Sequence, residues 1–488
     1  MLTYIFLDAP FTAEVKLNTW NATNCSQNSE TDIKKVGNTV LATWIRSDGV
    51  LNVDGNYLRM SFDGGNTWSA PLNYSSNNPQ CWIGDPAIAI QPDNPNVMLF
   101  AGMIYCQGQN PNDVRGEVYF CRCTAGTGCT NAGNWSCGIL GPNDNWAYFK
   151  DKPWLLAIGN NTVLANYTTD KYGNPSLVIY RSTNNGANWT EIGRTNWPAT
   201  VGYWTKDGNT IYMSYNDFTN VNNGQIGVGF LRSTNNGNSF QDVAWTFFNF
   251  GQSTSCPNYQ RPAKIHDNIT ASNNKVAIAF VDGNCKARIG VWTGSGNNLN
   301  VYQIAPTGGG SQQVLPMVAS SGNKIFAQWQ GRISSYGSCG NFNVGTWSTY
   351  WAVSNDWGQT WSSPQRVSSS DHPFTENPLG HDYNGWIIEG GRIYTTWSND
   401  YRGSQAGTNV YYSYTSTTSL EEVAFKKKPF SISYKEGFVI INAFKPFSIY
   451  SIDGKVVNSY GSGIYKLKNK QGLYFIVSEG YKEKVIFK

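Results

Sequence analysis

Acidic side chains stand at the points where several predicted strands begin. Asp85 directly precedes a proline and an apolar run, Asp151 holds a comparable place, and Asp382 precedes a third such run. Cleavage of a glycosidic bond usually requires two carboxyl groups, one on either side of that bond. Asp85, Asp151 and Asp382 are therefore the leading candidates for catalytic residues, with Asp400 and Glu376 as secondary candidates.

A second group of side chains near the same strand ends is suited to holding a sugar. Carboxylates and amides bind hydroxyl groups, aromatic faces cover the apolar side of a sugar ring, and arginine binds carboxylates through two parallel hydrogen bonds. The predicted substrate-binding residues are Arg46, Lys152, Trp154, Arg261, Arg332, His381, Asp400 and Arg402.

Several of these residues also have a simpler interpretation. Acids at strand ends often cap turns or hold a structural cation such as Ca2+. Lys152 can be a solvated loop charge, and His381 can be a hydrogen-bonding residue beside a turn. The prolines after Asp85 and Arg261 can serve only to shape the entry into a strand. The sequence therefore predicts no cofactor with certainty and leaves a structural Ca2+ open.

The elements that must position these residues are marked by four copies of one short pattern, Ser-x-(Asp/Asn)-x-Gly-x-x-aromatic. The copies span residues 61–68, 182–189, 233–240 and 354–361. In such a turn the Asp or Asn accepts backbone N–H groups, the glycine supplies a positive φ, and the aromatic ring closes over the turn. The Asp or Asn positions are Asp63, Asn184, Asn235 and Asp356.

The spacing of the copies predicts a ring of repeated units. Their Asp or Asn positions are 121, 51 and 121 residues apart, which fits one four-stranded unit in the middle interval and two in each outer interval. Degenerate copies of the pattern at 123–129 and 293–298 are candidates for the missing units. We predict an all-β fold, with a seven-bladed β-propeller over residues 1–416 and six blades as the alternative. A strand at 13–18 is expected to complete the seventh blade and close the ring.

These turns resemble the Asp boxes of sialidases and related β-propellers, and the stretch 382–397 resembles secreted proteins described as sialidase-like. The resemblance implies that the turns are structural and that a ligand binds on the opposite face, at the axial cleft. True sialidases carry their first arginine in an Arg-Ile-Pro motif, which this chain lacks; the corresponding region is 43–48. The resemblance therefore implies a sialidase-like propeller without implying sialidase activity.

The C-terminal part differs from the rest of the chain. After a linker at 417–428, residues 429–488 are predicted to form a small Ig-like β sandwich, and residues 426–488 contain 12 lysines and only 4 acidic residues. The segments at 449–457, 472–477 and 484–488 resemble type IX secretion sorting domains. That resemblance implies export, with the secretion machinery or the cell surface as a partner. An ordinary β accessory domain is the alternative.

Composition limits the partners and the compartment. The net charge of +4 is too small to indicate a nucleic-acid partner, and no run of about 18 apolar residues is present that would cross a membrane. Ten cysteines, three histidines and no Cys-x-x-Cys favour disulfides over a zinc site, and hence a secreted or cell-surface protein. The predicted bridges join Cys81 to Cys106, Cys256 to Cys285, and Cys121 to Cys137.

Three hypotheses for function follow, with a glycan or glycoprotein as the expected partner. The first is a secreted enzyme that acts on glycans through paired aspartates. The second is a propeller that binds carbohydrate or protein without catalysis, and the third is a surface-assembly protein. Two carboxyl groups at glycosidase separation in an open pocket favour the enzyme, whereas acids tied into turns beside exposed aromatic rings favour binding.

Overall fold

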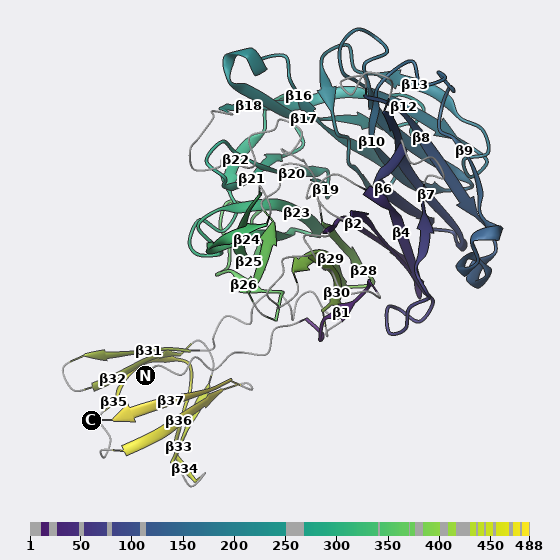
Figure 1. Cartoon of the computed structure of the whole chain (residues 1–488). Helices are drawn as coiled ribbons and strands as arrows, with labels where there is room; N and C mark the ends of the chain where they lie inside the picture. Colours follow the sequence, from purple (N-terminus) through teal and green to yellow (C-terminus); the bar gives the residue numbers. More distant parts are fainter. Residues whose placement is uncertain are drawn as a thin grey trace. The chain divides into compact units, whose positions relative to one another are not determined.

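The computed structural model divides the chain into two compact units, Met1–Thr418 and Ser419–Lys488 (Figure 1). The structure describes residues 11–18, 27–47, 53–75, 81–107, 114–249, 268–339, 342–369, 371–375, 384–400, 408–415, 430–435, 438–443, 446–451, 455–467, 472–478 and 481–487.

The first unit contains seven separate antiparallel sheets, which form the blades of a propeller (Figure 1). Blade 1 contains β2 (Gln27–Val36), β3 (Thr39–Ser47), β4 (Val53–Ser61) and β5 (Leu72–Tyr74). Blade 2 contains β6 (Cys81–Gln91), β7 (Asn94–Gln107), β8 (Val114–Cys123) and β9 (Ser136–Ile139), with the short 3-10 helices η1 (Gly126–Thr130) and η2 (Ala132–Asn134) before β9. Blade 3 contains β10 (Lys150–Gly159), β11 (Thr162–Thr169), β12 (Ser176–Ser182) and β13 (Thr190–Arg194).

The remaining four blades follow the same order with additions. Blade 4 contains β14 (Ala199–Thr200), β15 (Trp204–Asp207), β16 (Thr210–Asp217), η3 (Val221–Asn223), β17 (Gln225–Ser233) and β18 (Gln241–Asn249). Blade 5 contains β19 (Asn268–Ser272), β20 (Lys275–Val281), β21 (Ala287–Trp292) and β22 (Asn300–Gln303). Blade 6 contains β23 (Gln313–Ser321), β24 (Lys324–Cys339), β25 (Phe342–Ser354), β26 (Gln365–Arg366) and β27 (His372–Thr375). Blade 7 contains β28 (Gly385–Glu389), β29 (Arg392–Asp400), β30 (Thr408–Tyr414) and, from the start of the chain, β1 (Val15–Lys16). The predicted seven-bladed propeller is confirmed, and the six-bladed alternative is set aside.

The ring closes through hydrogen bonds between the two ends of this unit. β1 pairs with β30, with Val15 opposite Tyr412. The backbone N–H of Leu17 donates to the Val410 carbonyl at 2.8 Å, and the Arg59 guanidinium of blade 1 donates to the Leu17 carbonyl at 2.6 Å. Leu17 is fully buried in a core shared by blades 1 and 7. The N-terminal segment therefore joins the first and last blades, and β1 covers the edge of β30.

The first strand of each blade lies at the propeller axis. Around the ring, first strands contact one another from blade to blade: β2 contacts β6, β6 contacts β10, and the series continues through β15, β19, β23 and β28 back to β2. Residues near the beginnings of these strands therefore meet, although they lie far apart in the sequence.

The four copies of the sequence pattern form the connection between the third and fourth strands of blades 1, 3, 4 and 6, and we call them the repeated turns. In the first, the Asp63 carboxylate accepts the Ser61 hydroxyl at 2.7 Å and the backbone N–H and hydroxyl of Thr67 at 2.9 and 2.6 Å. The Trp68 indole N–H donates to the Gly65 carbonyl at 3.1 Å. The serine and Asp or Asn side chains thus replace backbone partners inside the turn.

The glycine of the pattern is required for a second reason, which is close approach to the preceding blade. Gly65 has a φ of 100°, and a Cβ there would lie 2.0 Å from the Tyr412 hydroxyl of blade 7. At Gly186 a Cβ would lie 2.1 Å from the Phe120 ring of blade 2. The glycines of these turns therefore permit close packing of blade 1 on blade 7 and of blade 3 on blade 2.

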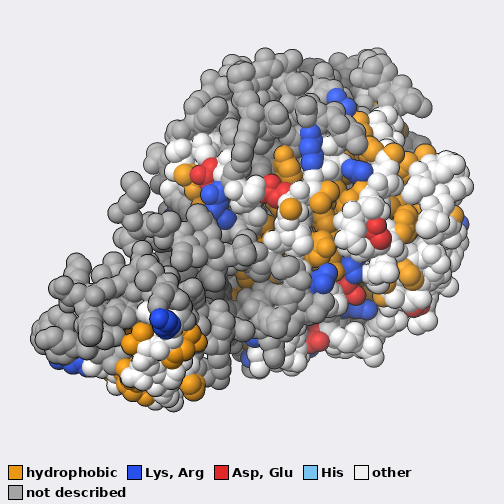
Figure 2. All heavy atoms as spheres, turned by 90° about the horizontal axis from the view of Figure 1, so that it is seen from below, with side chains coloured by type: hydrophobic (Ala, Val, Ile, Leu, Met, Phe, Trp, Pro, Cys, Tyr) orange, Lys and Arg blue, Asp and Glu red, His pale blue; other side chains and the backbone are white. Residues whose placement is uncertain are grey.

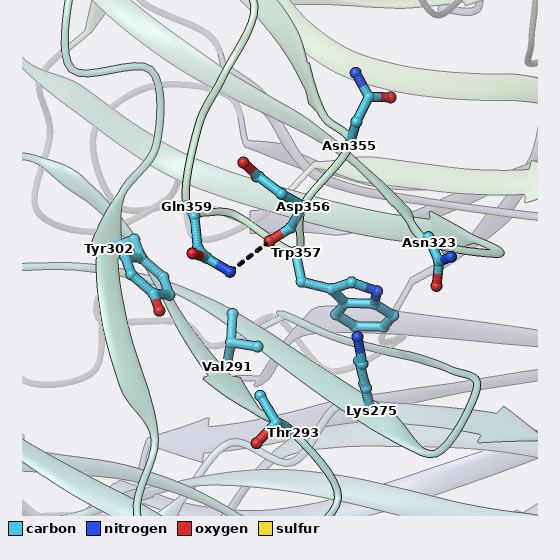
Figure 3. A pocket seen from close by; sticks show the side chains of 9 residues that line it. All are labelled: Lys275, Val291, Thr293, Tyr302, Asn323, Asn355, Asp356, Trp357 and Gln359. Atoms are coloured by element: carbon cyan, nitrogen blue, oxygen red, sulfur yellow. Dashed lines mark hydrogen bonds between the residues drawn. The ribbon is translucent and has the colours of Figure 1, made fainter.

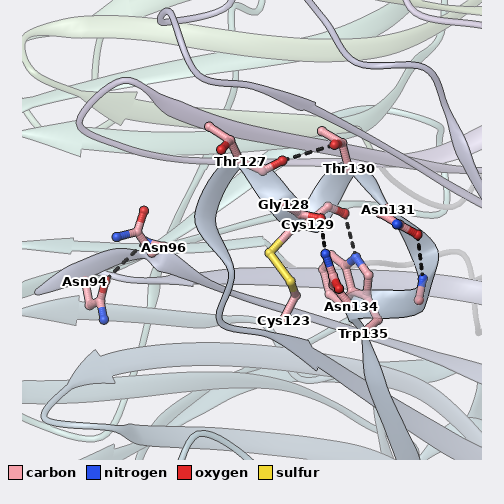
Figure 4. Close-up of a disulfide and its surroundings, with 11 residues drawn as sticks. Asn94, Asn96, Cys123, Thr127, Gly128, Cys129, Thr130, Asn131, Asn134 and Trp135 are labelled. Carbon is pink, nitrogen blue, oxygen red and sulfur yellow. Dashed lines mark hydrogen bonds between the residues drawn. A yellow bond between two sulfur atoms is a disulfide. The ribbon is translucent and has the colours of Figure 1, made fainter.

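A disulfide replaces the hydrogen-bonded turn in blade 2. Cys123 ends β8, as the pattern serine ends the third strand elsewhere, and it is bonded to Cys129 (Figure 4). The Trp135 indole N–H donates to the Cys129 carbonyl at 2.8 Å, as Trp68 does to Gly65. Blade 5 keeps only the indole bond, from Trp292 to the Gly296 carbonyl at 2.9 Å. The two degenerate copies expected from the sequence thus occupy the turn position. The Cys123–Cys129 bridge is a pairing that the sequence left open.

Two further bridges match the expected pairs. Cys81–Cys106 links β6 to β7 and Cys121–Cys137 links β8 to β9, each between residues directly opposite in the sheet. Cys285 is disulfide-bonded, and Cys256, its expected partner, lies outside the described residues.

The second unit contains two antiparallel sheets. One consists of β31 (Phe430–Lys435), β32 (Phe438–Ala443) and β35 (Gly463–Leu467), and the other of β33 (Phe447–Ser451), β34 (Val456–Tyr460), β36 (Gly472–Ser478) and β37 (Tyr481–Phe487). The Phe447 ring packs against Tyr465 of the other sheet at 5.5 Å between centroids.

The surface carries few charges. On the face that Figure 2 presents, basic and acidic side chains are dispersed among hydrophobic and uncharged polar ones, as expected for a chain with 14% charged residues. Among the described residues, no helix is long or apolar enough to cross a membrane.

Loss of the N-terminal closure should destabilise the whole propeller. Leu17→Ala empties a fully buried site between blades 1 and 7, so we expect it to lower the free energy of unfolding by about 2–5 kcal/mol. Val301→Ala, at a side chain that is 42% exposed, is the matched control and should change it by less than about 0.5 kcal/mol. Urea unfolding followed by tryptophan fluorescence measures both. Equal effects of the two variants would show that the N-terminal segment adds nothing to stability.

The first repeated turn should give the propeller acid sensitivity. Hydrogen bonds from Thr67 lower the pKa of Asp63 to about 2, from an ordinary 3.8. Because the pKa of Asp63 is lower in the folded than in the unfolded state, its ionised carboxylate stabilises the folded state. This stabilisation is fully present above about pH 4 and is lost as the pH falls toward about 2. Asp63→Asn copies the amide of the second and third turns, so its melting temperature should fall less steeply over that window than that of the wild type.

The reverse exchange provides the control. Asn235→Asp places a carboxylate in the third turn, where the Ser239 N–H already donates to the side chain at 3.1 Å. It should steepen the loss of melting temperature between pH of about 4 and 2. Parallel curves for all three proteins would contradict the assignment.

Candidate functional site

Five blades have a residue with a left-handed backbone in the first strand or, in blade 4, between β14 and β15. These residues are Glu30, Asp85, Lys152, Val201 and Leu315, with φ between 47° and 52°. In blades 1, 2, 3 and 6 the pairing with the second strand shifts at this residue, which marks a β-bulge. A positive φ is unfavourable for side chains of this size, and a bulge re-aims side chains relative to the regular strand alternation. In blades 1, 2 and 3 the bulges direct Glu30, Asp85 and Lys152 toward one another at the axis.

Three of these side chains are charged, and they meet. The Lys152 ammonium lies 2.5 Å from the Asp85 carboxylate and 3.5 Å from the Glu30 carboxylate. Asp85, Glu30 and Lys152 are 2%, 4% and 7% exposed. Blades 1, 2 and 3 thus each contribute one member of a buried ionic group, whereas Val201 and Leu315 hold the same position in blades 4 and 6.

Asp151 adds a second aspartate to this group. Its carboxylate accepts the backbone N–H of Lys152 at 2.8 Å, and it shares hydrogen bonds with the side chains of Asp85 and Tyr105. Asp151 is partly exposed, in contrast to Asp85. We call Glu30, Asp85, Asp151 and Lys152 the axial cluster; within it, Asp151 is the aspartate that is partly exposed as a residue.

The two aspartates differ in their affinity for a proton. Burial raises the pKa of Asp85, but the Lys152 ammonium and hydrogen bonds with neighbouring side chains outweigh it, and the pKa lies below its usual value. Burial and the negative charge of Asp85 hold the pKa of Asp151 well above its usual value. Asp151 is therefore the member of the pair that keeps the proton, and Asp85 is the ionised acceptor.

This arrangement can deliver a proton, but it does not provide both carboxyl groups of a glycosidase. Retaining enzymes hold their two carboxyl groups about 5–5.5 Å apart and inverting enzymes about 6.5–9.5 Å apart. Asp85 and Asp151 share a hydrogen bond, which places them too close to flank a glycosidic bond. A second catalytic carboxylate would have to come from another blade.

The other expected site residues divide into several groups. Arg46 and Arg332 are partly exposed and lie beside the bulged ends of blades 1 and 6.

Trp154 is 5% exposed, and its ring packs on Tyr203 with 4.0 Å between the ring centroids. Trp154 is therefore a core residue and not the sugar-binding face that the sequence suggested, because the strand turns its ring into the contact between blades 3 and 4. Lys152 is not a solvated loop charge, because the bulge buries it among carboxylates.

Several expected residues fall where the structure gives no description. Arg261, Glu376, His381, Asp382 and Arg402 lie outside the described residues. Asp400 ends β29, and its side chain also lies outside them.

Sequence reasoning missed two members of this site. Glu30 holds the bulge position of blade 1, but no proline follows it, so the pattern of Asp85 and Lys152 did not extend to it. Alignment of the blades on the hairpin after each first strand would have found it. Tyr105, on β7, is 7% exposed, and the contact of β7 with β10 of the next blade brings it to Asp151.

Other acids serve the structure alone. The Asp282 carboxylate accepts the backbone N–H groups of Asn284 and Lys286 at 2.9 and 3.0 Å and pairs with Arg288 at 2.6 Å. The fully buried Lys150 pairs with Glu117 at 2.5 Å between blades 2 and 3. These acids cap a turn and join two blades, as the simpler interpretation of strand-end acids expects.

Within the described parts of the chain, no group of three or more His, Cys, Asp or Glu side chains is arranged to hold a metal ion. The Ca2+ left open by the sequence stays a prediction.

Comparison with known proteins gives likenesses of fold only. No family profile matches the chain, and no curated protein matches it in sequence. Similar solved structures include a protein of unknown function from Dyadobacter fermentans, with 14% identity, a TM-score of 0.47, and coverage of 83% of this chain and 98% of that chain. The phage phi92 endosialidase has 12% identity, a TM-score of 0.47 and coverage of 94% and 75%. The polysaccharide lyase Uly1 has 9% identity, a TM-score of 0.48 and coverage of 83% and 98%.

Removal of the Lys152 ammonium group should destabilise the protein. Lys152→Met leaves Asp85 and Glu30 buried without their ammonium partner, so we expect a loss of about 3–5 kcal/mol in the free energy of unfolding at pH 7. The double variant Lys152→Met, Asp85→Asn should lose less than the single one, because it also removes the orphaned charge. Urea unfolding midpoints measure both.

A surface ion pair provides the matched control. Arg194→Met breaks the exposed pair with Glu191 and should cost less than about 1 kcal/mol. A Lys152 variant no less stable than this control would show that the axial cluster adds nothing to folding.

Proposed function

We propose that this protein is a glycan-processing enzyme whose site lies at the axis, at the bulged ends of the first strands. The observation that carries the proposal is the contrast between Asp151, which is partly exposed and keeps its proton, and Asp85, which is buried and ionised. Cleavage of a glycosidic bond requires a carboxylic acid that protonates the leaving oxygen. Asp151 is the proposed acid.

The remaining members of the cluster have supporting roles in this proposal. Asp85 accepts a hydrogen bond from Asp151 and raises its pKa, and Lys152 holds Asp85 ionised. Arg46 and Arg332, beside the bulged ends of blades 1 and 6, are the proposed contacts for an anionic group on the glycan. No sialic acid specificity is proposed, because the arginine motif of true sialidases is absent from the chain.

The second carboxylate is proposed to be Asp382. In sequence it precedes Gly385 by three residues, as Asp151 precedes Trp154, and Gly385 and Trp154 hold equivalent places in their first strands. In this alignment of the two sequences, Asp382 corresponds to Asp151. A pair drawn from separate blades leaves room for a sugar between the carboxyl groups, which the Asp85–Asp151 pair does not.

A non-catalytic carbohydrate-binding propeller is the second candidate. The observation that favours it is that the described carboxylates are tied to Lys152 and to each other. Under this alternative the axial cluster stabilises the fold and shapes a binding surface.

We also propose that the protein is exported. The disulfides suit an oxidising compartment, and the resemblance of the C-terminal segment to type IX secretion sorting domains supports a sorting role for the second unit.

A hydrolysis and elimination screen on purified protein tests the enzyme proposal. Once a substrate is found among polysaccharides and aryl glycosides, Asp151→Asn should lower kcat about 10²–10⁴-fold, the usual contribution of a general acid. Asp382→Asn should also abolish turnover. Asp85→Asn removes the charge that raises the pKa of Asp151, so the basic limb of its pH–rate profile should move to lower pH.

Thermal melting of each variant checks that the fold is intact. Undiminished turnover by folded Asp151→Asn protein would reject Asp151 as the acid. Glycan binding on an array by a protein that turns over no substrate in the screen would support the binding candidate instead.

A further inference from the structure

Two exposed aromatic side chains lie in adjoining loops of blade 3. Among the aromatic side chains that the structure describes, Trp146 and Tyr172 are the most exposed, at 36% and 38%. Trp146 lies in the loop that leads into β10, and Tyr172 lies in the loop between β11 and β12. A single exposed aromatic residue is ordinary, but two in adjoining loops indicate a binding surface.

Contacts between the two loops join them into one surface. The Lys171 ammonium of the second loop pairs with the Asp144 carboxylate of the first at 2.7 Å, and it lies 5.6 Å over the Tyr148 ring. The backbone N–H of Phe149 donates to the Asp170 carboxylate at 2.9 Å. The loops therefore hold a fixed position relative to each other.

This surface adjoins the axial cluster. Phe149 stands two residues before Asp151, and its ring stacks on Tyr105 with 5.7 Å between the ring centroids. Tyr105 in turn shares a hydrogen bond with Asp151. Asp151 is also paired with Thr168, close to the start of the second loop. A chain molecule bound at Asp151 therefore has both loops beside it.

A buried ion pair holds the loop that carries Trp146. The Glu117 carboxylate accepts the backbone N–H groups of Asp144 and Trp146 at 3.1 and 3.3 Å. It also pairs with the fully buried Lys150 ammonium, which donates to the Pro142 carbonyl at 2.9 Å. The loop backbone is thus fixed from the interior, and a residue that is ordered before binding loses little entropy when a ligand arrives.

The structure holds both aromatic residues in place although each is exposed. Trp146 has a left-handed backbone with a φ of 60°, a conformation that is strained for a bulky aromatic residue and is retained where the side chain has a use. The Arg194 guanidinium lies 4.0 Å over the Tyr172 ring, and the Tyr172 hydroxyl donates to Glu191 at 3.3 Å. Trp146 is therefore positioned by its loop, and Tyr172 by neighbouring side chains.

The charges around the two rings are paired within the protein. Lys171 is paired with Asp144, and Arg194 with Glu191 at 3.3 Å. The surface thus offers aromatic rings without an excess of either charge. Such rings suit the apolar faces of sugar residues.

We propose that Trp146 and Tyr172 form a sugar-stacking surface for a glycan chain that also occupies the axial site. The inference rests on the proposed glycan function of that site, and it adds the substrate class, which is an oligosaccharide or polysaccharide and not a single sugar. Trp146 and Tyr172 are positioning residues in this proposal, since they hold the chain beside the carboxyl groups and not at them.

Affinity electrophoresis of the full chain tests the proposal without requiring turnover. Native gels contain hydroxyethyl cellulose, arabinoxylan, arabinan, alginate, chondroitin sulfate or polysialic acid, and at least one should retard the wild type. Trp146→Asn and Tyr172→Ala should each raise the dissociation constant for that polysaccharide about three- to tenfold, the size of one aromatic contact. Trp146→Phe keeps a ring and should bind more tightly than Trp146→Asn.

Tyr302→Ala is the matched control. Tyr302 is partly exposed and lines a cavity of about 280 Å3 beside the fourth repeated turn (Figure 3). Lys275 and Asn323, from the hairpins that follow the first strands of blades 5 and 6, line the same cavity, so it lies at the other end of those strands. Tyr302→Ala should be retarded as the wild type is. Because asparagine tolerates a left-handed backbone, the melting temperature of Trp146→Asn should stay at or above that of the wild type.

The outcomes separate this proposal from the enzyme proposal. Retardation that falls in folded Trp146→Asn and Tyr172→Ala protein supports the stacking surface even if no polysaccharide is cleaved. Turnover that requires Asp151, together with unchanged retardation of the Trp146→Asn, Tyr172→Ala double variant, overturns the stacking surface alone. It is also overturned if no polysaccharide retards the wild type, or if only Tyr302→Ala loses retardation.

Discussion

Every other feature of this propeller depends on the packing of each blade against the next. A four-stranded antiparallel sheet has two faces, and in a ring both are covered only if each neighbour is held close. The glycines of the repeated turns permit this, because a Cβ at Gly65 would lie 2.0 Å from Tyr412 and a Cβ at Gly186 would lie 2.1 Å from Phe120. The pairing of β1 with β30 completes the ring and spares the last blade an open edge.

The ring also offsets the free-energy cost of burying the charges of the axial cluster. Charges such as Lys152 and Asp85 are expensive to bury singly, but three adjacent blades supply opposite charges at the same height. The bulges that aim them require a left-handed backbone at Glu30, Asp85 and Lys152. Such strain persists because the surrounding strands fix the backbone. The same crowding separates the proton affinities of Asp85 and Asp151.

The repeated turn shows how one position can be stabilised by different chemistry. Blades 1 and 6 use a carboxylate, blades 3 and 4 use an amide, and blade 2 uses the Cys123–Cys129 bridge. Where the internal bonds already hold the turn, its left-handed position is free to vary. The fourth turn has Trp357 there, and this residue creates a cavity wall that its sister turns, with glycine or asparagine, do not provide.

The sequence by itself determined the architecture. The intervals between Asp63, Asn184, Asn235 and Asp356 predicted six units, and strand patterns near 383–414 and at 13–18 predicted the seventh, because both signals are local and repeat along the chain. Tertiary structure alone decided which residues meet. Glu30 joins Lys152 across 122 positions only because two first strands lie at one axis. The sequence placed Trp154 beside the site, but the course of its strand turned the ring into the core. Side-chain direction at a bulge, and the proton affinity that follows from it, depend on contacts between blades that no local pattern records.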